Sequence, residues 1–102
     1  MLRIQEVEPL RGHWLRLTLT NGDVIERHVD AALWGPVFRR IRSDSAVFRA
    51  VRASGGTIEW PGEVDLDPEG LIWDGPPPAD PNARPVARLR LGRDAGTEAI
   101  IA

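Results

Sequence analysis

The strongest constraint on the fold is an Asn-Gly pair that lies between two strand-like runs. Leucines over residues 15–19 alternate with other residue types, which is the period-two pattern of a half-buried strand. Asn21-Gly22 then favours a tight hairpin turn, because both residues tolerate a positive φ. Residues 24–29 are the expected return strand, and residues 2–7 are an expected strand before the hairpin. The first third of the chain therefore predicts antiparallel strands.

Residues 31–51 predict helical structure. Val37, Ile41 and Phe48 belong to an apolar set at helical spacing. Ser43-Asp44 can end one helical turn and cap the next, so one bent helix and two short helices both remain open.

A second hairpin is expected over residues 52–60, with its turn at 54–56. Asp67-Pro68 predicts a further helix start, with aspartate as the cap and proline at the first helical position. Residues 74–81 are rich in proline and predict an extended linker. Residues 86–91 alternate again and could add an edge strand, in the same molecule or in a neighbour.

These elements indicate an α+β fold, in which a small antiparallel sheet of hairpins carries one or two short helices and a Pro-rich tail. We expect a compact domain over residues 1–75 and a linker and tail over residues 76–102, within the size range of a single domain. No apolar run approaches the roughly 18 residues that span a bilayer. Cysteine is absent, and residues 1–6 lack the apolar core of a signal peptide. A cytoplasmic protein without a membrane partner is the resulting expectation.

No catalytic motif is evident. Residues 65–70 partly resemble a calcium loop, but Pro68 interrupts the loop and Pro76 stands where a bidentate glutamate is needed. His13 and His28 are expected to be half-exposed strand residues, since no metal-ligand spacing accompanies them. We therefore expect no enzyme activity, no metal and no cofactor.

Charge is unevenly distributed along the chain. All 13 basic residues are arginine, and five of them lie in residues 39–52 beside a single acid, Asp44. Residues 53–83 contain seven acids and no basic residue. Three explanations remain open: the two segments neutralise one another, they bind a partner or a second copy, or the arginines bind nucleic-acid phosphate. The net charge of −2 and the pI near 5.6 make nucleic acid the less favoured partner.

Tryptophan and arginine are enriched at the energetic centres of protein interfaces. The predicted interface residues are Trp14, Trp34, Trp73, Arg39, Arg40, Arg42 and Arg49. Trp14 is expected to be exposed, on the face opposite the leucines, and Trp60 to pack in the core.

Three sequence pieces resemble the bacterial family catalogued as domain of unknown function 2442. They are residues 21–30, residues 33–48 and residues 56–69, and together the resemblance spans about residues 8 to 72. The family-motif residues, expected to be structural, are Asn21, Gly22, Gly56, Thr57, Trp60, Pro61, Asp65, Leu66, Pro68 and Glu69. The resemblance implies a compact α+β domain without an established activity. Some members of the family occur beside a second small family of unknown function, an arrangement that suggests toxin–antitoxin pairs. Other members carry a helix-turn-helix domain after this one, at the place where this chain has its proline-rich tail.

The favoured hypothesis is a non-enzymatic accessory module that binds another protein or a second copy of itself. A more specific form of this hypothesis is the antitoxin-like member of a two-protein system. In this hypothesis the tail wraps the partner. The alternative is a DNA-associated regulator that binds phosphate through the arginine-rich helical surface.

Overall fold

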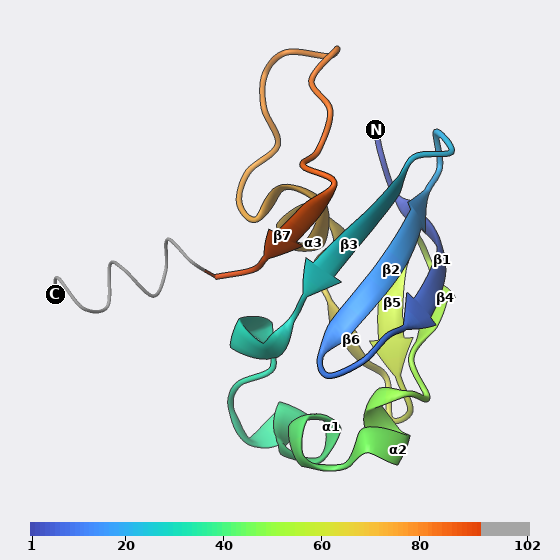
Figure 1. Ribbon diagram of the computed structural model, residues 1–102, viewed down its shortest axis with the longest axis vertical. Helices are drawn as coiled ribbons and strands as arrows, with labels where there is room; N and C mark the ends of the chain where they lie inside the picture. The colour runs from blue at the N-terminus through green and yellow to red at the C-terminus, as the bar shows by residue number, and fades with distance from the viewer. Residues whose placement is uncertain (93–102) are drawn as a thin grey trace, which may run out of the picture.

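The computed structural model describes residues 1–92, in which two small sheets lie one behind the other, with the short helices of residues 36–48 at one end (Figure 1). The four-stranded sheet has the order β1-β2-β3-β7 and the three-stranded sheet the order β4-β5-β6. The strands are β1 (Ile4–Pro9), β2 (Trp14–Leu19), β3 (Val24–His28), β4 (Arg52–Ser54), β5 (Thr57–Trp60), β6 (Val64–Leu66) and β7 (Arg88–Arg90). The predicted α+β class is confirmed.

The Asn-Gly turn joins β2 to β3 as the sequence predicts. Gly22 adopts a φ of 91°, and the Asn21 side-chain oxygen accepts a hydrogen bond from the Asp23 backbone N–H at 2.9 Å. Leu15, Leu17 and Leu19 all face inward and are fully buried. This pairing gives the four-stranded sheet one apolar face and one polar face.

Four short helical segments follow β3. The 3-10 helices η1 (Asp30–Ala32) and η2 (Pro36–Phe38) lead into α1 (Arg39–Ser43) and α2 (Ser45–Phe48). Asp44 separates the last two, and its carboxylate accepts a hydrogen bond from the Ala46 N–H at 3.0 Å. The two-helix alternative is therefore the correct one, and Asp44 is the residue that interrupts the helix.

The three-stranded sheet and the last helix come next. The glycine turn at residues 55 and 56 joins β4 to β5, and the Ile4 N–H donates to the Gly56 carbonyl at 2.9 Å, which links the two sheets. Asp67 caps α3 (Pro68–Trp73) by accepting from the Gly70 N–H, with Pro68 at the first helical position as predicted. Trp60 is buried, and its Nε1 donates to the Phe48 carbonyl at 2.9 Å.

One core extends through both sheets and contains a single buried charged residue among those described, Arg27. Its side chain has 0% exposure. The guanidinium donates from Nε to the Leu71 carbonyl at 2.7 Å, from Nη2 to the Ile72 carbonyl at 2.8 Å and from Nη1 to the Glu26 carbonyl at 2.8 Å. Burial lowers the pKa of Arg27 to about 10, which still leaves it charged at neutral pH. Arg27 therefore binds β3 to the last turn of α3.

The predicted edge strand forms within the same molecule. β7 pairs with β3 in parallel, because the chain crosses over after α3 and returns in the direction of β3. This pair departs from the purely antiparallel sheet expected. Leu91 enters the core with 5% exposure, and Arg84 forms an ion pair with Asp23 that lowers the pKa of that carboxyl. The end of the predicted tail, residues 93–102, lies outside the described residues.

Replacing Arg27 by methionine should lower the free energy of unfolding by about 3 kcal/mol, because two buried carbonyls of α3 lose their donors. Urea titrations followed by tryptophan fluorescence measure this loss. Arg49 is exposed, and Arg49→Met should change stability by no more than about 0.5 kcal/mol. Equal stability of Arg27→Met and wild type would show that the two hydrogen bonds from Arg27 to the Leu71 and Ile72 carbonyls do not hold α3 in place.

A chain that ends at residue 75 should still fold, if the predicted domain boundary is right, but should melt at a lower temperature. Loss of Leu91 alone removes burial worth about 2 kcal/mol. Leu91→Ala in the full chain should reproduce much of the loss, and Val86→Ala, at an exposed position, should not. Calorimetry distinguishes these outcomes, and an unchanged melting temperature after truncation would mean that the segment does not contribute to the core.

Candidate functional site

The five-residue helix α1 separates two hollows on the surface. It buries only Ile41, so its three arginines all reach solvent. Arg39 and Arg42 are three positions apart, share one side of the helix and line the first hollow, with Ser43. Arg40 lies on the other side and lines the second hollow. We call the first hollow the basic pocket and the second the apolar groove.

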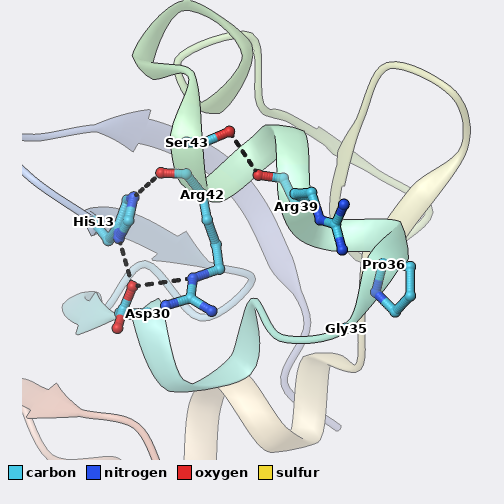
Figure 2. A pocket seen from close by; sticks show the side chains of 7 residues that line it. All are labelled: His13, Asp30, Gly35, Pro36, Arg39, Arg42 and Ser43. Carbon is cyan, nitrogen blue, oxygen red and sulfur yellow. Dashed lines mark hydrogen bonds and ion pairs between the residues drawn. The ribbon is translucent and has the colours of Figure 1, made fainter.

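The basic pocket has a volume of about 530 Å³ and opens to solvent beside η1 and α1 (Figure 2). Its lining residues are His13, Asp30, Gly35, Pro36, Arg39, Arg42 and Ser43. Asp30 lies between two basic groups: its Oδ1 is 2.9 Å from His13 Nδ1 and 3.7 Å from Arg42 Nε. Arg39 has no acidic partner among residues 1–92, so the pocket retains positive charge that this part of the fold does not neutralise.

His13 positions α1. Its Nδ1 contacts the Asp30 carboxylate, and its Nε2 lies 3.2 Å from the Arg42 carbonyl at the end of α1 (Figure 2). Both neighbours are acceptors, so both hydrogen bonds exist together only when the ring carries two protons. His13 lies in the turn before β2 and not on a strand, which corrects the expectation from sequence. The turn residue therefore ties the helical segment to the four-stranded sheet.

The four predicted arginines of the interface lie on α1 and just after α2, and all are exposed. Within residues 1–92, Arg39, Arg40 and Arg49 form no ion pair, whereas Arg42 contacts Asp30. One ion pair among the described residues joins the arginine segment to the acidic segment, between Arg52 and Glu59 at 3.2 Å. In the described part of the chain, none of the four predicted interface arginines forms an ion pair with an acid of residues 53–83.

The tryptophans differ in exposure. Trp34 is 73% exposed in the loop before η2, next to Gly35 and Pro36 of the basic pocket. Trp73 is half-buried against the core. Trp14 lies on the outer sheet face as expected, but β7 half-covers it: the Arg88 guanidinium stacks 3.9 Å from its ring centroid. Of the three candidate interface tryptophans, Trp34 alone presents most of its ring to solvent.

The family-motif residues lie mainly in the turns, strands and core of the fold. Trp60 is in the core, Asn21 and Gly22 form the first hairpin turn, and the Thr57 hydroxyl donates to the Leu66 carbonyl. Pro61 lines the apolar groove. Asp65 pairs with Glu59 across β5 and β6, and Pro68 and Glu69 form the first turn of α3.

Within residues 1–92, no cluster of three or more histidines, cysteines or acids has the arrangement of a metal site. None of the helices described there is long and apolar enough to cross a membrane.

Two features of the site region were missed from sequence. Arg27 occupies an inward-facing position between Ile25 and Val29, and that break in the alternation of β3 was the available signal. The contact of His13 with Asp30 had no local signal, because 17 residues separate the two.

The outer sheet face gives a prediction for His28. Burial first, then the charge of Arg90, lower the pKa of His28, whose Nδ1 lies 3.2 Å from the Arg90 guanidinium. As pH falls the unfolded chain takes up the proton first, so His28 contributes stability that is present above about pH 6.5 and declines below it. An NMR titration should place the His28 midpoint below 6.5, and Arg90→Gln should raise it. A wild-type midpoint at or above 6.5 would contradict this geometry.

Comparison with known proteins gives two findings. Residues 4–75 match the model of a family described as "Protein of unknown function (DUF2442)". Among solved structures, the chain is similar to the crystal structure of "Putative DNA Binding Protein NE0471" from Nitrosomonas europaea ATCC 19718, with a TM-score of 0.54 and 31% sequence identity. The match covers 61% of this chain and 41% of that chain, so the present chain spans less than half of that relative. No curated protein matched the chain.

The family match begins at the first residue of β1 and ends two residues after α3, so it includes both hairpins, the basic pocket and the apolar groove. On this extent of agreement, the chain belongs to the DUF2442 family.

Proposed function

We propose that this chain is a non-enzymatic module that binds another protein through the basic pocket and Trp34. The observation that carries the proposal is an exposed tryptophan beside a pocket whose Arg39 has no acidic partner among residues 1–92. An aromatic anchor next to arginine is the composition typical of protein-interface hot spots.

The pocket fits an acidic group from a partner. Arg39 and Arg42 lie on the same side of α1, and guanidinium groups bind carboxylates through paired N–H donors. Asp30 and His13 hold the Arg42 end of the pocket in place before the partner arrives, which reduces the entropy lost on binding. Burial of the Trp34 ring would add about 2–3 kcal/mol of favourable free energy.

The hypothesis from sequence has the tail contacting the partner, whereas this proposal places the partner contacts around α1. Residues 88–91 already pair with β3 and fill the core of the same molecule, so they are occupied before any partner binds. The antitoxin-like member of a two-protein system is the specific form of this proposal, and its support is the family context.

The second candidate function is DNA association through the same arginines. It is favoured by the name of the solved relative from Nitrosomonas europaea. Two observations favour protein binding instead: the chain has a net charge of −2, and Asp30 places a carboxylate inside the pocket.

A native pull-down of the tagged protein from its host, at low and high salt, tests both functions. Trp34→Ala and Arg39→Glu should each reduce recovery of one stoichiometric partner protein by roughly tenfold or more, at both salt concentrations. Arg49→Glu is the matched control, because it makes the same charge change on an exposed residue that does not line the pocket.

Protein recovery that is equal for Arg39→Glu and Arg49→Glu would contradict a role for the pocket. Recovery of nucleic acid that is lost at high salt, and weakened equally by both variants, would favour DNA association, because counterion release depends on total charge.

A further inference from the structure

The apolar groove lies on the opposite side of α1 from the basic pocket. It has a volume of about 470 Å³, and its lining residues are Pro36, Val37, Arg40, Ile41, Ala46, Val47, Ala50, Pro61 and Val64. Arg40 is the single charged residue in this lining. Val37, at the rim of this apolar lining, is 66% exposed.

Opposite charges lie on one wall of the apolar groove and beside the other. On the α1 wall, Arg40 is exposed and makes no ion pair within residues 1–92. Beside the other wall, Glu63 lies in the turn from β5 to β6, between the lining residues Pro61 and Val64, and does not itself line the groove. Glu63 is also exposed, and its side chain makes no ion pair or hydrogen bond with any described residue. Arg40 on one wall and Glu63 beside the other are thus two opposite charges for which residues 1–92 supply no partner.

Glu63 also has an unfavourable backbone conformation. Its φ is 63°, in the left-handed region that glycine and asparagine adopt more easily. This conformation belongs to the three-residue turn that connects Trp60 of β5 to its partner Val64 of β6. The turn therefore places an exposed acid next in sequence to the groove-lining Val64.

We propose that the apolar groove binds a second copy of this chain. A two-fold axis along the groove places the α1 wall of each copy against the β5–β6 wall of the other. Arg40 of one copy then faces Glu63 of the second copy, twice in the dimer, and the apolar linings of the two grooves face one another. This contact does not depend on the proposed function, because the basic pocket and the apolar groove share only Pro36 among their lining residues.

A second copy fits this groove better than an acidic or a basic peptide. An acidic segment attracted by Arg40 would be repelled by Glu63, and a basic segment would meet the reverse problem. A two-fold related copy supplies both complementary charges by symmetry, and such an interface closes on itself as a dimer without growing into a filament.

Charge reversal tests the contact. The mass of the full-length protein, measured by sedimentation equilibrium from micromolar to millimolar concentration, should rise from monomer to dimer. Arg40→Glu and Glu63→Arg should each raise the dimer dissociation constant by roughly tenfold or more, because each puts like charges together twice. Glu63→Arg keeps a non-glycine residue at the same backbone position, so it does not relieve the local strain.

Two combinations of these variants should restore dimerisation. The double variant, Arg40→Glu with Glu63→Arg, should dimerise again, and the two single variants should form a mixed dimer when combined. Arg49→Glu, outside the groove, should dimerise like wild type.

A wild-type protein that stays monomeric at millimolar concentration would overturn the proposal. A dimer that is unaffected by either charge reversal, or that the double variant does not restore, would also overturn it by placing the interface elsewhere. Neither outcome affects the pull-down result for the basic pocket, so the two proposals fail separately.

Discussion

The buried guanidinium of Arg27 is the interaction on which the arrangement of this fold depends. It reaches from the middle of β3 to the last turn of α3 and provides donors to two carbonyls there. β3 is paired with β7 on one side and leads directly into the helical segment that forms the site. A buried charge without partners is strongly destabilising, so α3 has one position in which the Arg27 donors are satisfied. This requirement orients the second half of the chain against the first.

The helical segment at the site is also held by contacts between residues far apart in the sequence. α1 and α2 are too short to be stable as isolated helices, since isolated helices need about 12–15 residues or more. The contacts that hold them are Ile41 and Phe48 in the core, the Trp60 hydrogen bond to the Phe48 carbonyl, and His13 at the end of α1. Because so little of α1 is buried, its arginines reach solvent on both sides of the helix, in the basic pocket and in the apolar groove.

Local patterns in the sequence predicted the local structure well. The Asn-Gly turn, the Asp44 and Asp67 caps and the glycine turn after β4 all form where the residues indicate, because each depends on atoms within a few positions. The contacts that define the site were not predictable in this way. Arg27 binds carbonyls 44 and 45 residues away, and His13 meets Arg42 across 29 residues. A single sequence gives the face on which such a side chain lies but not its partner, and the parallel β3–β7 pair was missed for the same reason.

The two proposed surfaces are compatible because α1 keeps them apart. In a dimer formed along the apolar groove, both basic pockets remain open, and the two-fold axis repeats them at a fixed separation. A partner with two acidic segments, or a partner that is itself a dimer, would then bind at two points, and the second contact would form at the high effective concentration set by the first. Modest affinity at each small pocket would be enough for stable association. If both proposals hold, the short helix α1 is the shared wall between a self-association surface and a partner-binding surface.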